Sequence, residues 1–403
     1  MRTTYVVALA LISGGLLVGC ERLTTSPADA ADVFDAPLPG LTMAEAAAFA
    51  RGDEEFERRF APGEGLGPIF NNASCGSCHS GDGRGVLDNA LQRIGSDNDD
   101  LLRGVGGPQI QDKAIPGAVP ETVPAGAAVS LRLPPPSFGV GLIEAIPDAV
   151  ILALADPDDA DGDGISGRPN IVTVADYVVA ATGSAGVVNT VGRFGRKAQT
   201  ASLLQQVAEA YHQDMGITTD FLPVENVNPL AQQVGIAADR VGDPELPAST
   251  VHAVTTYIRL LAPSAPGEMT PERARGRDLF TAVGCARCHV PELNTGPNAI
   301  AALSNKTVRL FSDLLLHDMG DELADNRPDH QATGREWKTP PLWGLRLVPR
   351  FLNGQMLLMH DGRARTIEEA ILLHGGEGSG ARSRFQSLTP AERRALIAYL
   401  ESL

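Results

Sequence analysis

Cys75-Gly76-Ser77-Cys78-His79 is a five-residue motif that returns in kind as Cys285-Ala286-Arg287-Cys288-His289. Two cysteines separated by two residues and followed by histidine form the attachment pattern of a c-type haem. The thiols form thioethers with the haem vinyl groups, and the histidine then lies beneath the iron as its proximal ligand. One copy alone would also fit a chance pattern, a redox pair or half of a zinc site. Two intact copies predict two covalently bound haem c groups, with His79 and His289 as iron ligands.

Composition is consistent with a globular protein of two or three domains. The chain has 403 residues, of which 43% are hydrophobic and only 5% aromatic. Four of the five cysteines belong to the two motifs, so no disulfide framework is expected. The formal net charge of −16 argues against binding to nucleic acid or anionic lipid headgroups, and would suit a basic redox partner.

Residues 1–20 have the features of a bacterial lipoprotein signal peptide. Arg2 supplies the positive start, and an apolar run from Tyr5 to Val18 ends in Leu17-Val18-Gly19-Cys20, which resembles a lipobox. The alternative is an ordinary signal peptide with a chance cysteine. We expect Cys20 to carry the lipid, and the protein to be anchored on the periplasmic side of the inner or outer membrane.

The rest of the chain divides by composition and by helix signals. Residues 21–40 are small, polar and proline-bearing, and predict a tether. Helices are expected to begin after Thr42, Thr270 and Thr389, which all have N-cap chemistry. We predict an N-terminal haem domain over residues 41–265 and a C-terminal cytochrome c domain over residues 266–403.

A weak internal repeat supports this division. Phe70 and Phe280 each precede a motif by five residues, and Tyr257 and Tyr399 occupy matching places in two similar helices. In small cytochromes c the first and last helices cross, with an aromatic residue from each at the contact. The expected fold is therefore mainly α, with two cytochrome-c-like domains. The first carries a long loop-rich insertion, because residues 80–128 are rich in Gly, Pro and Asp.

An acidic loop predicts a calcium site. Asp159, Asp161 and Asp163 stand at positions one, three and five, and Gly164 at position six, as in an EF-hand loop. Position twelve is Asn170 where such loops have a bidentate glutamate. A solvated acidic turn is the alternative.

Several further blocks resemble the bacterial dihaem oxidoreductases that are grouped with peroxidases. More distantly, the C-terminal half is similar to dihaem cytochrome c peroxidases and MauG-type enzymes. The resemblance covers nearly all of the chain after the signal peptide. The matching blocks are residues 72–85, 141–147, 192–195, 315–320 (Leu-Leu-His-Asp-Met-Gly), 334–344 and 360–370, which contains His360-Asp361-Gly362 and Thr366-Ile367-Glu368-Glu369-Ala370.

The resemblance implies an activity and two further site residues. Hydrogen peroxide would be reduced at the N-terminal haem, with electrons relayed by the C-terminal haem. Glu144 lies where the related peroxidases keep an acid–base glutamate. His374 lies fourteen residues after His360, where those enzymes place a methionine that binds the second iron. We therefore expect His289 and His374 to coordinate the second haem.

Two other functions fit the same residues. The protein could be an electron-transfer protein without peroxidase activity, or a haem-dependent oxygenase. The expected partners are a small oxidisable or reducible substrate such as hydrogen peroxide, and a small redox protein or quinol-linked electron donor. Nucleic acid is not expected, and contact with the membrane is expected only through the lipid anchor.

Overall fold

Helices are the main regular elements of the computed structural model, which describes residues 32–83, 85–95, 109–123, 125–182, 189–226 and 236–403. The helices are α1 (Met43–Glu57), α2 (Cys75–Cys78), α4 (Val140–Glu144), α5 (Asp148–Leu152), α6 (Asp176–Thr182), α7 (Leu203–Asp214), α9 (Ala248–Leu260), α10 (Pro271–Val283), α11 (Val348–Phe351), α12 (Ile367–Leu373), α13 (Ser379–Gln386) and α14 (Pro390–Leu400). The signal peptide, with Cys20, lies outside these ranges.

The strands pair into small antiparallel sheets of two strands each. The pairs are β1 (Ile69–Phe70) with β3 (Lys113–Ala114), β2 (Leu91–Gly95) with β4 (Ala128–Arg132), β5 (Ile171–Thr173) with β6 (Asn189–Val191), β7 (Leu293–Asn294) with β8 (Thr307–Val308), and β9 (Leu316–Asp318) with β10 (Glu336–Lys338). The expectation of a mainly α protein is thus confirmed in part, because several small two-stranded sheets accompany the helices. Across the described ranges, no helix is both long and apolar enough to cross a bilayer.

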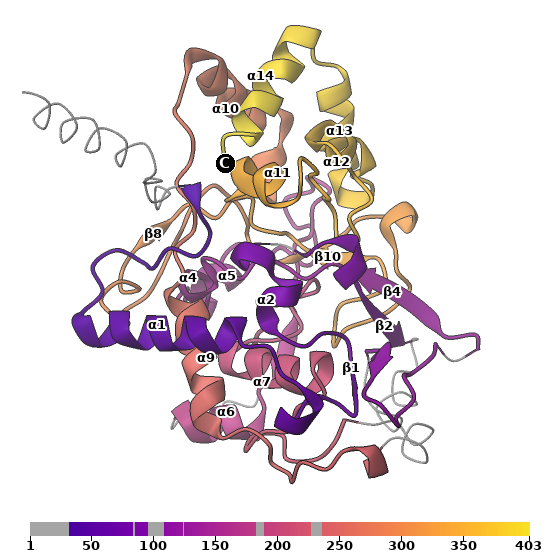
Figure 1. The fold of residues 1–403 in the computed structure, drawn as a ribbon. Coiled ribbons are helices and arrows are strands. Elements are labelled where there is room, and N and C mark those ends of the chain that lie inside the picture. Colours follow the sequence, from indigo (N-terminus) through magenta and orange to yellow (C-terminus); the bar gives the residue numbers. More distant parts are fainter. Residues whose placement is uncertain (1–31, 84, 96–108, 124, 183–188, 227–235) are drawn as a thin grey trace, which may run out of the picture.

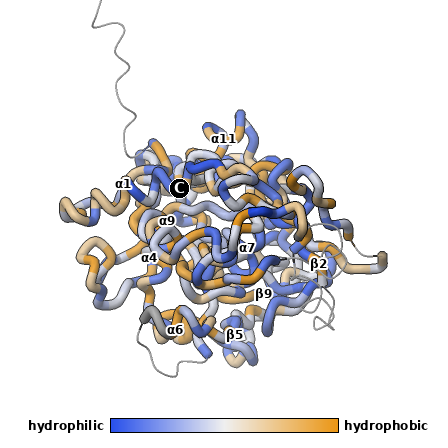
Figure 2. Tube along the Cα trace, turned by 60° about the horizontal axis from the view of Figure 1, so that its bottom comes forward, coloured by the Kyte–Doolittle hydropathy of each residue, from blue (hydrophilic) through white to orange (hydrophobic). Residues whose placement is uncertain are grey.

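The helices gather toward two ends of the molecule. Figure 1 shows α10, α12, α13 and α14 at one end, and α1, α6, α7 and α9 toward the other. Hydrophobic and hydrophilic stretches are interleaved along the chain in Figure 2, as expected where helices and loops each bury one side. One buried cluster consists mainly of residues before 262, with a smaller share from 293–347, and a second lies mostly within 280–403.

The predicted helix starts are confirmed, with the expected capping. Thr42 and Thr389 each accept a hydrogen bond from the backbone of the glutamate three residues later, and that glutamate bonds back to the cap. Thr270 caps α10 before Pro271. These caps satisfy backbone N–H groups that a helix start would otherwise leave unpaired.

Two crossed helix pairs repeat between the halves of the chain. α1 packs against α9, and α10 packs against α14. At the crossings, the Phe56 and Tyr257 ring centroids are 5.3 Å apart, and those of Phe280 and Tyr399 are 5.8 Å apart. Phe56, and not Phe70, is therefore the counterpart of Phe280. Phe70 was paired with Phe280 because each lies five residues before its motif. The true counterpart, Phe56, lies nineteen residues before Cys75, so the spacing differs between the two halves.

A glycine allows close approach at each crossing. A Cβ atom on Gly276 would lie 2.0 Å from the carbonyl oxygen of Ala395, and one on Gly52 would lie 2.3 Å from that of Ala253. Gly276→Ala should therefore destabilise the protein by about 1–3 kcal/mol through overpacking, although alanine is intrinsically the better helix former by about 1 kcal/mol. The free energy of unfolding in denaturant measures the effect.

Gly380→Ala in α13 is the matched control for this substitution. The nearest atom to a Cβ there is the flexible end of Arg384, 3.4 Å away. This variant should keep or slightly raise the free energy of unfolding. Equal stability of the Gly276 and Gly380 variants would contradict the close crossing.

The predicted tether is too long at its C-terminal end. Phe34 is buried and its ring stacks on Phe138, with the centroids 4.3 Å apart. The Leu38 amide donates to the Leu260 carbonyl at 2.7 Å, and the carbonyl of Ala36 accepts from Ala262 at 2.8 Å. Residues 34–38 therefore belong to the folded body, because their apolar side chains contribute to its core.

Candidate functional site

Each five-residue motif forms a single helical turn. In the first, α2 is capped by Ser74, which accepts from the Ser77 amide at 3.1 Å, and the His79 amide donates to the Cys75 carbonyl at 2.9 Å. In a helical turn, residues three apart face the same side. Cys75 and Cys78 therefore share a face, and the histidine follows at the end of the turn.

The second motif repeats this arrangement after α10. Helix α10 ends at Gly284, whose φ of 93° is a left-handed conformation that favours glycine. Residues Cys285–Arg287 then form a 3₁₀ turn, and the His289 amide donates to the Cys285 carbonyl at 2.9 Å. Within the described chain none of the four motif cysteines is in a disulfide, so each remains available for a thioether.

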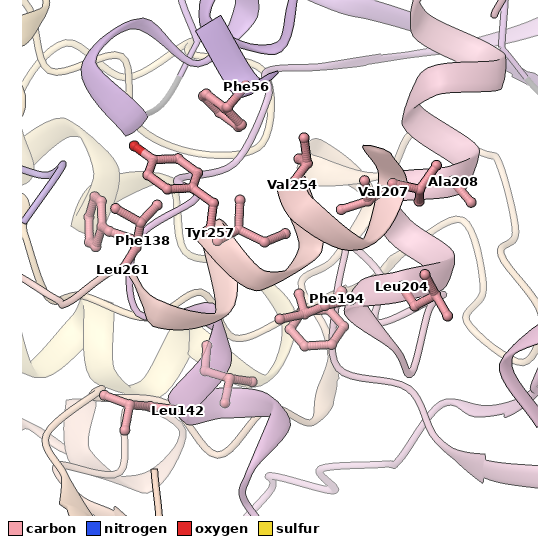
Figure 3. Close-up of a cluster of buried hydrophobic side chains, with 14 of the residues drawn as sticks. Phe56, Phe138, Leu142, Phe194, Leu204, Val207, Ala208, Val254, Tyr257 and Leu261 are labelled. Atoms are coloured by element: carbon pink, nitrogen blue, oxygen red, sulfur yellow. The ribbon is translucent and has the colours of Figure 1, made fainter. Parts of the chain in front are cut away.

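Both motifs open into one continuous cavity of about 440 Å³. This volume lies within the range of cofactor pockets. The predicted residues that line it together are Cys75, Cys78, His79, Cys285, Cys288, His289 and His374. The lining includes the apolar side chains of Phe56, Phe194, Val207 and Val254, which are labelled in Figure 3.

His289 of the second motif and His374 are both held in the form that can bind a metal. Nδ1 of His289 donates to the Phe311 carbonyl at 3.0 Å, and Nδ1 of His374 donates to the Ala370 carbonyl at 2.7 Å. A ring that donates through Nδ1 keeps Nε2 as the ligand atom. Both rings line the same cavity, and burial, followed by the charge of His374, lowers the pKa of His289 to about 4.

His79 is also kept neutral. Burial lowers its pKa to about 4, although nearby carbonyl groups of Gly83 and Pro135 act in the opposite direction. A neutral imidazole is the ligand form of histidine. The Phe56 ring lies beside it, with the centroids 6.2 Å apart.

The cavity wall carries more positive than negative side chains. Its cationic residues, among those described, are Arg193, Arg196, Lys338, Arg382 and Arg384, against the carboxylates of Asp214 and Glu377. Nζ of Lys338 donates to the Arg193 carbonyl at 2.8 Å, and no described carboxylate bonds it. Burial and then the charge of Arg196 lower the pKa of Lys338 to about 7. A half-buried lysine that no described carboxylate bonds suits a ligand that brings carboxylates.

Glu144 does not line the cavity, although Val140 and Ile143 of the same helix do. Its Oε2 accepts from Nε of Arg259 at 2.6 Å, and its Oε1 accepts from the Leu203 amide at 2.9 Å. Both carboxylate oxygens are thus engaged in holding α4 against α7 and α9. Its acid–base role stays a prediction, and this arrangement does not place it at the reaction site.

The acidic loop gathers a different set of carboxylates from the one expected. Asp156, Asp159 and Asp161 bring ligand atoms within 4.8 Å of one another. Asp163 is turned away, because its Oδ2 pairs with Arg287 at 2.7 Å. Arg287 lies inside the second motif, so the loop contacts this motif. Calcium binding itself stays a prediction.

A further acid on the cavity wall and a separate cluster of three acids were not expected from the sequence. Asp214 lines the cavity, and burial raises its pKa to about 6. Elsewhere, Glu225, Asp239 and Glu245 bring carboxylate oxygens within 4.8 Å, and one buried oxygen of each lacks a hydrogen-bond partner. Asp239 and Glu245 lie in the segment that precedes α9, and Glu225 lies further back along the chain, so no simple spacing reveals the group.

The free energy of unfolding should depend on pH through Glu225. Burial, followed by its contact with Asp239, raises the pKa of Glu225 to about 9 in the folded protein, against an ordinary value of 4.5. Between these values the folded state binds the extra proton, so stability falls as pH rises from about 5 to about 9.

Glu225→Gln replaces the titrating carboxyl with a neutral amide. The free energy of unfolding of the variant should therefore rise relative to that of wild type as pH rises. Denaturant unfolding at pH 5 and pH 8 with a chelator present measures the difference. Glu54→Gln, at an exposed carboxylate, is the control and should show no such trend. A difference between the Glu225 variant and wild type that is the same at both pH values would contradict the prediction.

The two histidine-bearing motifs line one cavity. The cavity therefore offers two sites for a cofactor that contains a metal and carboxylate groups. The family described as "Di-haem oxidoreductase, putative peroxidase" matches residues 17–100 and 124–403. The chain belongs to this family. It is therefore an oxidoreductase with two haem groups.

Distant likenesses to solved structures include the following two. Kuenenia stuttgartiensis hydrazine synthase, pressurised with xenon, is 16% identical over 100% of this chain and 99% of that chain, with a TM-score of 0.39. A MauG-like protein associated with microbial copper homeostasis is 15% identical over 72% of this chain and 94% of that chain, with a TM-score of 0.29. Comparison with curated protein sequences finds no match.

Proposed function

We propose that the protein is an exported dihaem c-type oxidoreductase that reduces hydrogen peroxide at its N-terminal haem, with electrons relayed by its C-terminal haem. The observation that carries this proposal is the single cavity lined by both motifs. Two haem groups in one cavity can exchange electrons, and peroxide reduction to water needs two electrons.

The residues present fit two haem groups. Cys75, Cys78 and His79 would hold the first, and Cys285, Cys288, His289 and His374 the second. The excess of cationic side chains, with Lys338 lacking a carboxylate partner, suits the haem propionates. When bound, haem supplies the iron that binds peroxide and the electrons that reduce it.

The two sites differ in the side chains that face them. At the second, His374 gives a further imidazole on the wall of the same cavity as His289. At the first, the apolar lining includes Phe56, Phe194, Val207 and Val254, which Figure 3 labels. His289 and His374 would together hold the second haem. Apolar walls at the first would exclude bulk water from a reacting peroxide.

Repeated helix pairs support a fold of two cytochrome-c-like modules. In each, an initial helix crosses a final helix through a glycine and an aromatic pair, as seen at Gly52 with Tyr257 and at Gly276 with Tyr399. We place the modules at residues 41–265 and 266–403, with the loop-rich insertion in the first. The predicted lipid on Cys20 would hold both on the periplasmic side of a membrane.

The donor would be a small redox protein or a quinol-linked carrier. The net charge of −16 suits a basic partner, because opposite charge speeds association. Export agrees with the covalent attachment that the two motifs predict.

Glu144→Gln should slow peroxide reduction by roughly 10²-fold or more if this carboxylate moves the proton between the peroxide oxygens. For this, Arg259 would have to release the carboxylate that it now binds. Single-turnover mixing of the reduced protein with peroxide measures the rate. Asp214→Asn is the competing variant, since Asp214 lines the cavity. A wild-type rate for the Glu144 variant together with a slow Asp214 variant would transfer the role to Asp214.

The ferric EPR spectrum of the protein with both haems tests the proposal against its alternatives. We expect one low-spin haem with two histidine ligands and one component with an open position. Two low-spin haems that stay closed on partial reduction would indicate an electron-transfer protein. Oxygen uptake with an organic substrate, and no turnover of peroxide, would indicate an oxygenase.

A further inference from the structure

The segment that faces His289 is bonded directly to the second motif. Three consecutive amides, from Phe311, Ser312 and Asp313, donate to carbonyls of Pro291, Val290 and Cys288 at 3.4, 2.9 and 3.0 Å, respectively. The Phe311 carbonyl in turn accepts from Nδ1 of His289 at 3.0 Å. Asp313 is therefore fixed relative to the proximal histidine.

The segment that follows His374 is bonded to a different part of the molecule. Glu377 lies in the 3₁₀ turn Gly376–Gly378, and its Oε1 accepts from Oγ of Ser166 at 2.7 Å and from the Asp318 amide at 3.2 Å. A Cβ atom on Gly376 would lie 2.1 Å from the carbonyl of Asp318. The turn after His374 is thus packed tightly against the end of β9.

His317 in β9 connects these two segments. Its ring is only 3% exposed, with Nε2 at 2.8 Å from Oδ2 of Asp313 and Nδ1 at 2.6 Å from Oε2 of Glu377. The ring also lies against the second motif, with Nδ1 at 3.7 Å from Sγ of Cys288.

The ring is positively charged, because both of its nitrogens face carboxylates. Burial opposes this charge, but the hydrogen bonds to Asp313 and Glu377 raise the pKa of His317 above its ordinary value. The interaction of a buried imidazolium with two carboxylates has a fixed direction as well as charge attraction, since each N–H group donates to one carboxylate.

We propose that His317 is a positioning residue for the second haem, which ties the segment bonded to His289 to the segment that carries His374 and so holds the two ligands at a fixed separation. This inference rests on the proposed coordination of that haem by His289 and His374. It requires nothing of peroxide chemistry. Without the imidazolium, two buried carboxylates face each other, and repulsion would push the turn that contains Glu377 away.

His317→Gln tests the inference in the protein with both haems, by its ferric EPR spectrum. We expect the low-spin signal of the second haem to fall by at least half, while the signal of the first haem is unchanged. His317→Arg should restore most of the low-spin signal, because a guanidinium can bond both carboxylates. Arg335→Gln, which removes an exposed ion pair of Asp318 at the end of β9, is the control and should resemble wild type.

Glu377→Gln keeps the inference testable if the His317 variant does not fold. It leaves the pair of His317 with Asp313 and removes only the charge on the side of His374, so a partial loss of the same signal is expected. Wild-type low-spin signals in both variants would overturn the proposal, even if the melting temperature of either were lower. A wild-type protein without a haem held by two histidines would also overturn it, whereas failure to reduce peroxide would contradict only the proposed function.

Discussion

Replacing Cys75 and Cys78 together with serine is expected to leave one covalent haem per chain and to abolish peroxide reduction. Serine has nearly the same shape as cysteine but forms no thioether, so the first motif could no longer retain its haem. His79 would remain, but a single imidazole bond without the two covalent links holds haem weakly. The mass of the purified chain and its haem absorbance would measure the loss of one of two groups.

The matching double variant of Cys285 and Cys288 separates the two sites. It should also retain one haem, but the low-spin signal assigned to His289 and His374 should be the one that disappears. Both variants remove one cofactor from the same cavity. A non-specific folding defect would therefore alter both spectra in the same way, whereas loss of one particular haem would not. Two haems in either variant would show that these cysteines are not the attachment points.

His374→Met is expected to raise the reduction potential of the second haem by on the order of 100 mV, within the roughly 0.8 V range that axial ligands set. A thioether favours ferrous iron, whereas imidazole donates more strongly and favours ferric iron. The structure supports this site, because the ring of His374 is held through Nδ1 and lines the same cavity as His289. A potentiometric titration followed by absorbance measures the shift.

Near-infrared spectroscopy supplies the control for this variant. The wild-type ferric protein should lack the thioether–iron charge-transfer band, and the variant should acquire it. His252→Met, at an exposed position on α9, should change neither the band nor the potential. A charge-transfer band in wild type that survived His374→Ala would show that a methionine such as Met356 or Met359 closes the iron instead.

The sequence predicted the local parts of the site because these depend on neighbours in the chain. A Cys-x-x-Cys-His turn needs only its own helical geometry, and both motifs form it. The caps at Thr42, Thr270 and Thr389 likewise involve partners three residues away. His374 was found by counting from His360, and it lines the same cavity as His289.

Features that depend on contacts between distant segments were missed or misplaced. Equal spacing suggested Phe70 as the counterpart of Phe280, but the helix crossing uses Phe56. The EF-hand pattern in the loop included Asp163, whose carboxylate is taken by Arg287, 124 residues away. The three residues that connect the ligand segments, Asp313, His317 and Glu377, meet only through the pairing of β9 and the turn after α12. No local pattern reveals such a contact.

We propose that two haem groups in one cavity serve a single two-electron reaction. Titration of the fully reduced protein with hydrogen peroxide, followed by absorbance, tests this proposal directly. We expect one equivalent of peroxide per chain to oxidise both haems, because two electrons and two protons convert one peroxide to two waters. Two equivalents for complete oxidation, or no oxidation by peroxide while a small redox protein exchanges electrons readily, would contradict it.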